Sequence, residues 1–503
     1  MAIAPDFAAF TATYDAGRPQ VAWSTMVADL ETPVSAMLKL GAGRENAFLL
    51  ESVEGGAVRG RYSIIGLAPD LIWRCHGDCA EINRRALEDV DAFESVNGGA
   101  LASLRQVIAD ARIELPPSLP PMAAGLVGYL AYDMVRLMEE LPAPNPDPLG
   151  LPDGLMLRPT IMAIFDAVAD TVTVVTPIRP APGIDARAAY AGAESRIARV
   201  VAELDRPLPH ETASAAAPVS VANVSASMSR EAFHDVVKRA KEYIAAGDVF
   251  QVVPSLRFSV PFSLPPFSLY RALRRTNPSP FLFYLDFGGF SVVGSSPEIL
   301  VRLRDGKVTI RPLAGTRPRG RDGAEDAALE KELLADEKER AEHLMLLDLG
   351  RNDVGRVSRI GTVRVTEQMC IERYSQVMHI VSNVDGEIAP GLDAMDALIG
   401  GFPAGTVTGA PKIRAMEIID ELETVKRGTY AGTVGYFSAN GSMDTAIVLR
   451  TALVKDGVMY AQAGAGIVAD SDPESEYQEC HNKARALMRA AEEAVRYASR
   501  AGA

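Results

Sequence analysis

The sequence predicts an α+β fold built on large antiparallel sheets. Strand-like apolar segments occur in runs, and the helical patterns are grouped instead of alternating regularly with the strands. A Lys455, Asp456, Gly457 turn also joins two apolar segments, which is typical of a β-hairpin. A chain of 503 residues is long enough to bury a large core around such sheets.

The clearest single element is a helix over residues 230–246. Ser229 is suited to cap its N-terminus, apolar residues from Phe233 to Ile244 recur at helical spacing, and Gly247 ends it. Pro411 is suited to the first position of a later helix. We expect strands within residues 249–260, 280–287, 290–303, 307–316, 430–438, 446–454 and 458–468, and further helices over about 324–352, 392–401, 411–423 and 476–499.

Residues 206–228 are small and polar and show no periodicity, so we expect a linker there. The linker separates an N-terminal region, residues 1–205, from a C-terminal region, residues 229–503. The C-terminal region holds most of the motifs considered below.

Composition excludes several classes of function. The net charge of −14, without any Lys/Arg-rich stripe, argues against a nucleic-acid partner. Four cysteines do not make a disulfide framework and fit a reducing cytosol, so we expect a cytoplasmic protein. The first residues do not form a signal peptide, and the absence of a stretch of about eighteen apolar residues predicts no membrane span.

Two acidic clusters carry the strongest chemical signal. Glu339 and Glu342 are three residues apart in a helical pattern, as are Glu476 and Glu479, so each pair lies on one helix face. If the two helices face each other, four carboxylates converge, and a hard cation such as Mg²⁺ makes that arrangement tolerable. Solvated helix faces are the alternative, but the apolar run after Glu342 favours burial. Lys483 follows Glu479 by one turn.

Two residues interrupt apolar segments. Arg450 lies in the middle of segment 446–454, where an arginine is seldom buried without an anionic partner. His379 also interrupts an apolar run, and both a hydrogen-bonded core histidine and a general acid or base remain open for it. Tyr430, taken by itself, is better explained by packing.

Glycines at predicted strand ends suggest close approach of backbone and ligand. Gly315 precedes Thr316 at the end of one strand, and Gly464 and Gly466 end another. A tight turn is the alternative for Gly315. No glycine-flanked nucleophile is present, so we do not expect covalent catalysis.

The strings SSPEIL, PLAGTRPRG, EKERAEHLMLLDLGRND, YSQVMHIVSNVDG, GTVTGAPK, YAGTVGYF, IVLRTALV and AGAGIVADSDPESEYQECHNKA occur in the order found in chorismate-utilising enzymes. The resemblance runs from about residue 228 to 495. Within that family the chain is most similar to the large-subunit (component I) branch of anthranilate synthases, and FLLESVEGGAVRGRYSIIG resembles the regulatory segment of that branch. The resemblance implies a layered sandwich of large antiparallel sheets flanked by helices.

The resemblance also implies a site. One glutamate from each cluster, Glu342 and Glu479, holds Mg²⁺, while Glu339 and Glu476 hold metal-bound waters. Mg²⁺ then binds the ring carboxylate of chorismate. The implied substrate-binding residues are Gly315, Thr316, Thr406, Tyr430, Arg450, Gly464, Ala465, Gly466 and Lys483.

The implied reaction has two steps. Ammonia adds at ring C2 as the C4 hydroxyl departs, with Glu298 as general acid, and pyruvate is then eliminated with assistance from His379. Relatives that add water carry a lysine base where this chain has Gln251, a neutral amide that suits ammonia. Ala314 replaces a lysine typical of aminodeoxychorismate synthases. That activity, or a non-catalytic tryptophan-binding regulator, is the alternative.

Regulation and partners follow from the same resemblance. The tryptophan pocket corresponds to Glu51 and Ser52, together with Pro280, Phe281 and Leu282, where the family usually has Tyr and Met at the last two positions. A site built from both regions implies that they interleave in space. A separate glutamine amidotransferase subunit supplies ammonia, and the expected assembly is a heterotetramer of two large and two small subunits.

Overall fold

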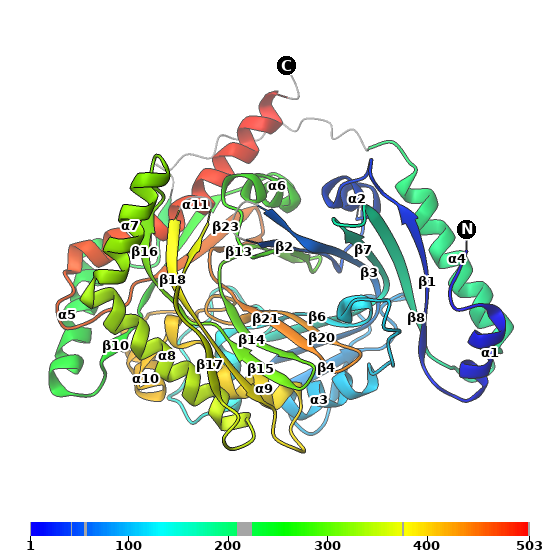
Figure 1. Ribbon diagram of the computed structural model, residues 1–503, viewed down its shortest axis with the longest axis horizontal. Helices are drawn as coiled ribbons and strands as arrows, with labels where there is room; N and C mark the ends of the chain where they lie inside the picture. Colours follow the sequence, from blue (N-terminus) through cyan, green and yellow to red (C-terminus); the bar gives the residue numbers. More distant parts are fainter. Residues whose placement is uncertain (1, 42, 55–57, 209–223, 375–376, 501–503) are drawn as a thin grey trace.

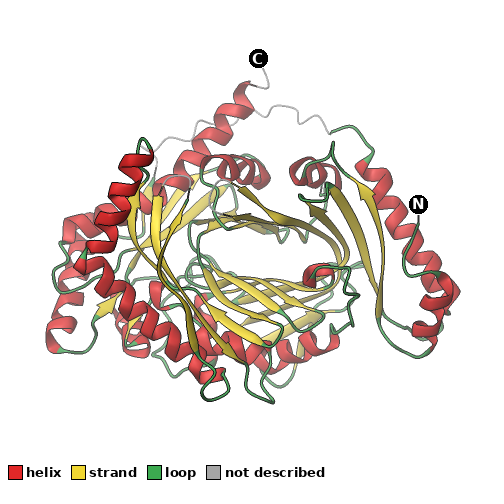
Figure 2. Cartoon of the chain, viewed as in Figure 1, coloured by secondary structure: helices red, strands yellow, loops and turns green. Residues whose placement is uncertain are grey.

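The computed structural model describes residues 2–41, 43–54, 58–208, 224–374 and 377–500. Two layers of antiparallel strands face each other, and helices cover the outside of each layer (Figures 1 and 2). The predicted α+β class with large antiparallel sheets is therefore confirmed. None of the helices in the described ranges is long and apolar enough to cross a membrane.

The elements before residue 209 are mainly strands. The strands are β1 (Gln20–Val27), β2 (Ala47–Glu54), β3 (Val58–His76), β4 (Cys79–Asn83), β5 (Glu94–Val96), β6 (Gly125–Leu130), β7 (Gly154–Asp166) and β8 (Thr171–Ile178). The helices are α1 (Phe7–Asp15), α2 (Pro33–Leu40), α3 (Ala100–Asp110) and α4 (Ala186–Leu204), with short 3₁₀ turns η1 (Pro121–Ala123) and η2 (Tyr132–Leu137).

The elements after residue 223 carry the motifs. The strands are β9 (Ser225–Ala226), β10 (Gln251–Val252), β11 (Ser255–Pro261), β12 (Phe281–Asp286), β13 (Phe290–Ser296), β14 (Ile299–Arg304), β15 (Lys307–Ile310), β16 (Leu313–Pro318), β17 (Arg364–Arg373), β18 (Val377–Glu387), β19 (Gly409–Ala410), β20 (Thr433–Ser438), β21 (Met443–Ile447), β22 (Thr451–Lys455) and β23 (Val458–Gly464). The helices are α5 (Arg230–Ala246), α6 (Pro266–Thr276), α7 (Gly323–Ala335), α8 (Glu337–Val357), α9 (Ala394–Gly401), α10 (Lys412–Leu422) and α11 (Pro473–Arg500), with η4 (Gly405–Val407).

Strands from both ends of the chain share one sheet. β2 pairs with β3 on one edge and with β12 on the other, in a register that places Glu51 opposite Leu282 and Ser52 opposite Phe281. β6 pairs in the same way with β20. Most of the predicted linker at 206–228 falls on residues 209–223, which lie outside the described residues.

Three apolar clusters hold the layers together. One lies between the two sheets and includes Phe48, Tyr129 and Phe283. The second joins the upper sheet to α2, α4, α6 and α11, and the third joins the lower sheet to α3, α8 and α9. The sandwich is therefore buried on both faces of each sheet.

Several predicted ends are confirmed. The Ser229 side chain accepts a hydrogen bond from the Ala232 N–H and caps α5, which ends at Gly247 with φ of 86°. The turn between β22 and β23 has positive φ at Asp456 and Gly457, 51° and 74°. Two consecutive residues with positive φ are the requirement of a two-residue type I′ hairpin.

Other predicted elements are interrupted. The strand expected over 249–260 is two strands, because Pro254 has no N–H for a ladder. Pro297 separates β13 from β14 in the same way, and Asp336 ends α7 while its carboxylate caps α8. Pro411 precedes α10 as its N-cap and is not its first residue, which corrects the prediction for that helix.

Truncation of a side chain between the shared strands should destabilise the fold. Leu49 on β2 is 0% exposed, so Leu49→Ala should lower the free energy of unfolding by about 2–5 kcal/mol, measured by denaturant titration. Leu30 is 94% exposed, and Leu30→Ala should change the free energy of unfolding by less than about 0.5 kcal/mol. Equal effects of the two changes would contradict the placement of β2.

Candidate active site

β16 and β18 bring Thr316 and His379 side by side. The two residues are opposite each other in the ladder, and Thr316 Oγ1 lies 2.9 Å from His379 Nδ1. Gly315 adopts φ of 76°, a left-handed conformation that glycine reaches without strain, and its carbonyl oxygen lies 3.2 Å from the same nitrogen. Gly315 is not at the end of its strand, as the sequence predicted, because β16 continues to Pro318 and Gly315 lies at a register shift within it. It forms part of the histidine's surroundings.

These contacts assign the tautomer of His379. The Gly315 carbonyl can only accept, so Nδ1 carries the proton, and Nε2 has a free lone pair. Nε2 is buried and has no hydrogen-bond partner among the described residues. Burial, helped by the charge of Arg450, lowers the pKa of His379 to about 4, so the ring is neutral at pH 7 and Nε2 can act as a base.

The pKa of Glu298 is shifted in the opposite direction from that of His379. Its side chain is buried in the turn between β13 and β14, where Thr406 Oγ1 of η4 donates to Oε2 at 3.3 Å. Burial raises the pKa of Glu298 to about 8, although Thr406 and Arg450 partly oppose this. Glu298 therefore keeps its proton at neutral pH and can act as an acid.

Arg450 is not in the middle of a strand, which corrects the sequence prediction. It occupies the break between β21 and β22 with φ of 47°, and its carbonyl accepts from the Ser295 N–H at 3.2 Å. Within the described residues its half-buried guanidinium forms no ion pair. Burial lowers the pKa of Arg450, while Tyr374 and Glu298 act to raise it. A desolvated guanidinium of this kind favours an anionic ligand.

The two glutamate pairs lie on α8 and α11 as predicted. Gln251 Nε2 donates to Glu342 Oε1 at 3.4 Å, and Glu339 accepts from Arg317 at 3.0 Å. Lys483 Nζ lies 2.7 Å from Glu479 Oε1, one turn away on α11, and also donates to the Gly464 carbonyl at 2.9 Å.

The donor set fits a hard cation in its chemistry. Burial, together with Glu339, raises the pKa of Glu342, and burial also raises the pKa of Glu476 next to Glu479. A divalent cation would relieve this crowding of carboxylates. In the part of the chain that the structure describes, however, no three acidic, histidine or cysteine side chains gather as metal ligands. Arg317 and Lys483 lie against Glu339 and Glu479 and place positive charge beside these carboxylates.

The strand end at Gly464 and Gly466 allows two side chains to approach the backbone. A Cβ at Gly464 would lie 2.8 Å from the Tyr430 hydroxyl, and one at Gly466 would lie 2.7 Å from Gln251 Nε2. In the structure these two glycines make room for side chains, and close approach of a ligand to them stays a prediction. The N–H of Ala465 donates to the Pro254 carbonyl at 3.1 Å and is not available to a ligand.

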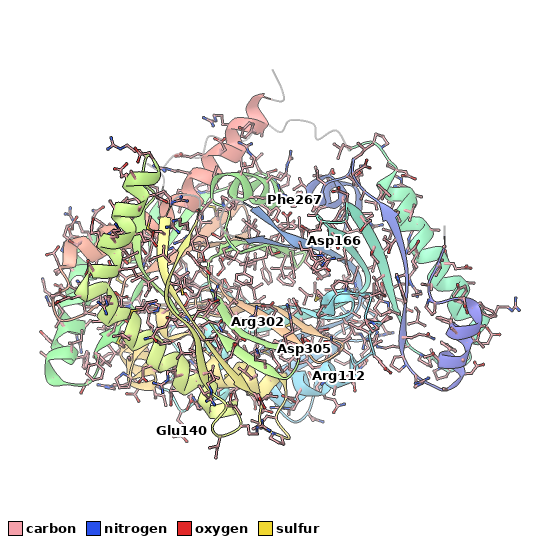
Figure 3. The ribbon with its side chains drawn as sticks, in the orientation of Figure 1. Arg112, Glu140, Asp166, Phe267, Arg302 and Asp305 are labelled. Atoms are coloured by element: carbon pink, nitrogen blue, oxygen red, sulfur yellow. The ribbon has the colours of Figure 1, made fainter. Side chains whose placement is uncertain are left out.

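A cavity of about 960 Å³ lies between the sheets. Glu51, Ser52, Pro280, Phe281 and Leu282 all line it, and so does Glu298. Figure 3 shows Arg302, another lining residue, on the lower layer beside this space. The residues expected to form one pocket therefore do lie together.

Glu51 differs from the other pocket residues. Its carboxylate is buried and accepts from Arg274, Tyr270 and Ser63, so its oxygens are already satisfied. A saturated carboxylate holds the pocket wall in place and has little capacity left for a ligand.

Sequence reasoning missed several residues of the site. Tyr374 donates to Glu372 at 2.7 Å and packs edge-on against His379, with ring centroids 5.5 Å apart. Arg317 binds Glu339, and Tyr436 lines the cavity. Tyr374 is the first residue of the string YSQVMHIVSNVDG that contains His379, and this was the one signal that pointed to it.

Comparison with known proteins agrees with this geometry. Residues 58–489 match the chorismate binding enzyme family. Anthranilate synthase component 1 of Cereibacter sphaeroides is 59% identical over 99% of this chain and 99% of its own length. This chain belongs to the anthranilate synthase component 1 family. The Pseudomonas putida protein of the same name is 50% identical over 92% of this chain and 93% of its own length.

Solved structures agree with this membership. The crystal structure of anthranilate synthase component I from Streptococcus pneumoniae has a TM-score of 0.74 and 38% identity, covering 85% of this chain and 92% of that one. The menaquinone-specific isochorismate synthase of Escherichia coli, at 21% identity and a TM-score of 0.70 over 94% and 95%, shares the fold. The layered sandwich implied by the resemblance is thus the fold of chorismate-utilising enzymes, as predicted.

The raised pKa of Glu298 predicts how stability depends on pH. The folded protein holds this proton more tightly than the unfolded chain, so the contribution to stability is full below about pH 4.5 and is lost as pH rises through about 8. Glu298→Gln, which stays neutral, should match the parent near pH 4.5 and be more stable by about 2–4 kcal/mol at pH 9.

Denaturant titration at the two pH values measures this difference. The control is Glu88→Gln, which changes an exposed glutamate. Its free energy of unfolding should equal that of the parent at both pH values. Parallel curves for Glu298→Gln and the parent would show that Glu298 is ionised in the folded protein.

Proposed function

We propose that this chain is the large subunit of an anthranilate synthase. It converts chorismate and ammonia to anthranilate and pyruvate, the first step of tryptophan biosynthesis, as a cytoplasmic lyase. The observation that carries the proposal is the grouping of a neutral acid, Glu298, and a neutral base, His379, around the guanidinium of Arg450. The match to the chorismate binding enzyme family supports chorismate as the substrate.

Substrate binding uses opposite ends of a dicarboxylate. Arg450 takes one carboxylate, because its guanidinium has no ion-pair partner among the described residues and is partly desolvated. The same substrate site would include Thr316, Tyr430 and Lys483 with Gly315, Gly464 and Gly466. Of these, Tyr430 and Lys483 both approach Gly464. Ala465 remains part of the proposed site, but its N–H cannot bind the substrate because it is already bonded to the Pro254 carbonyl.

The first step replaces the C4 hydroxyl with an amino group at C2. Ammonia is already a nucleophile, so Gln251 needs only to present an uncharged amide, and a base at that position is not required. Glu298 donates its proton to the departing hydroxyl, which leaves as water, and Thr406 orients the carboxyl group.

The second step forms the aromatic ring. His379 Nε2 takes a ring proton as pyruvate is eliminated, and Thr316 and the Gly315 carbonyl keep the proton of the imidazole on Nδ1. Burial lowers the pKa of His379, so the imidazole is a weak base. A weak base is sufficient for this step, because formation of the aromatic ring provides most of its driving force.

Magnesium is part of the proposal. Glu342 and Glu479 are its ligands, and Glu339 and Glu476 hold its bound waters. Bound there, the ion would neutralise the ring carboxylate of chorismate. The raised pKa values of Glu342 and Glu476 support a cation at this position.

A partner subunit is implied by the component 1 name of the relatives. We propose a glutamine amidotransferase subunit that supplies ammonia, in a heterotetramer of two large and two small subunits. Free ammonium should replace the partner in an assay of this chain alone.

The test is an assay of purified chain with chorismate, Mg²⁺ and ammonium at alkaline pH, followed by anthranilate fluorescence and product mass. We expect anthranilate and pyruvate, with activity lost on addition of EDTA. An aminated product that keeps its enolpyruvyl group would assign the chain to aminodeoxychorismate synthases. The buried Ala314, opposite Ile380 in the ladder, argues against that branch.

Glu342→Gln tests the metal ligand in the same assay. Activity should fall by about 10²-fold or more, and the Mg²⁺ concentration for half-maximal activity should rise, because an amide is a weaker ligand than a carboxylate. Glu337→Gln, at an exposed position on the same helix, should retain activity. Full activity of Glu342→Gln would remove Glu342 from the metal site.

We also propose feedback inhibition by tryptophan bound in the cavity between the sheets. Glu298 lines that cavity with Ser52, Pro280, Phe281 and Leu282, and this shared wall supports coupling between effector and reaction. Tryptophan binding would shift the population toward a state with a poorer chorismate site. Glu51 supports the pocket through Arg274.

Ser52→Phe should weaken this inhibition, because the added ring fills part of the cavity. We expect the tryptophan concentration for half inhibition to rise about 10-fold or more, consistent with the loss of about 1.4 kcal/mol of binding. Inhibition curves for the parent and for Ser195→Phe, an exposed control on α4, complete the measurement. An unchanged curve for Ser52→Phe would place the effector elsewhere.

A further inference from the structure

A fully buried ion pair lies beneath the proposed site. Arg427 and Glu423 have side chains that are 1% and 5% exposed, and Nη2 of the arginine lies 2.6 Å from Oε1 of the glutamate. Arg427 Nε also lies 3.0 Å from Glu423 Oε2. Neither residue contributes a group to the steps described above.

The guanidinium has two further hydrogen bonds, both to backbone carbonyls of the site. Arg427 Nη1 donates to the Val407 carbonyl and Nη2 donates to the Val253 carbonyl, each at 2.7 Å. Val407 follows Thr406, which binds Glu298. Val253 lies two residues after Gln251, which binds Glu342.

The glutamate binds the other end of the second segment. Glu423 Oε1 accepts from the Ser255 N–H at 2.8 Å and from the Ser255 hydroxyl at 2.7 Å. Gln462 of β23 donates to the same hydroxyl at 2.8 Å, which ties the strand that ends at Gly464 to the pair. The guanidinium carbon also lies 5.5 Å from the ring centroid of Tyr430.

Stability alone is a poor explanation for this arrangement. Desolvation of two charges offsets most of their attraction, so apolar residues of equal size would often serve a fold as well. What a guanidinium adds is a rigid fork of donors that can bind a carboxylate and two carbonyls at once. The carbonyls that it binds belong to the two segments bearing Thr406 and Gln251.

We propose that Arg427 and Glu423 are positioning residues that fix the Gln251 and Thr406 segments relative to each other and to Tyr430. The proposal rests on the proposed function for its meaning in catalysis. Through these bonds the pair fixes the positions of two groups. One is the Gln251 amide, which faces the nucleophile, and the other is the Thr406 hydroxyl, which orients Glu298.

Arg427→Lys tests the proposal, because lysine keeps the charge next to Glu423 but cannot bind both carbonyls. We expect kcat for anthranilate formation to fall on the order of 100-fold, as for a misplacement of about 1 Å. Deuterium uptake should rise in peptides covering 251–255 and 405–410. The control is Arg44→Lys, since Arg44 binds both oxygens of Glu203 and the Leu40 carbonyl far from the site.

The exchange measurement separates this inference from the proposed function. If the parent chain forms no anthranilate, the proposed function fails, and uptake in the two segments still decides the positioning role. The positioning role would be overturned if deuterium uptake in both segments of Arg427→Lys stayed at the parental level. A general rise in uptake across the sheets would overturn it as well. Should Arg427→Lys not fold, Arg427→Gln combined with Glu423→Gln removes both charges and should raise uptake in the same two segments.

Discussion

The hydrogen-bonded pairing of β2 with β12 is the contact on which the remaining architecture depends. β12 pairs next with β13, which ends beside Glu298, and β13 pairs with β22, which begins beside Arg450. These three consecutive ladders therefore fix the wall of the central cavity and two groups of the proposed site. Because register in a sheet moves in steps of whole residues, these groups cannot shift independently without breaking ladder bonds.

Burial and the charge of Arg450 give Glu298 and His379 different protonation states. Burial pushes the pKa of Glu298 up and that of His379 down, and Arg450 opposes the first effect while adding to the second. One environment thus provides an acid that keeps its proton and a base that lacks one at the same pH. Neither group needs a charged partner within bonding distance, which leaves Arg450 for a ligand.

Local patterns were enough to predict the class of fold and the glutamate pairs on their helices. They failed where distant segments decide the conformation. The strand break at Arg450 depends on a hydrogen bond from Ser295, and no periodicity around residue 450 contains that information. Glu51 stays a predicted ligand contact, but its bonds to Arg274 and Tyr270, more than 200 residues away in sequence, could not be foreseen from any local pattern.

The close contact at Gly466 has a consequence for how the family can vary. A methyl group there meets only the flexible end of Gln251, so the fold would tolerate alanine by turning the amide away. The turned amide would no longer reach Glu342. A side chain at this position would therefore change the direction of the Gln251 amide more than the folding of the chain. A screen for stability alone would pass over such a variant, whereas an assay of the activity proposed above would detect it.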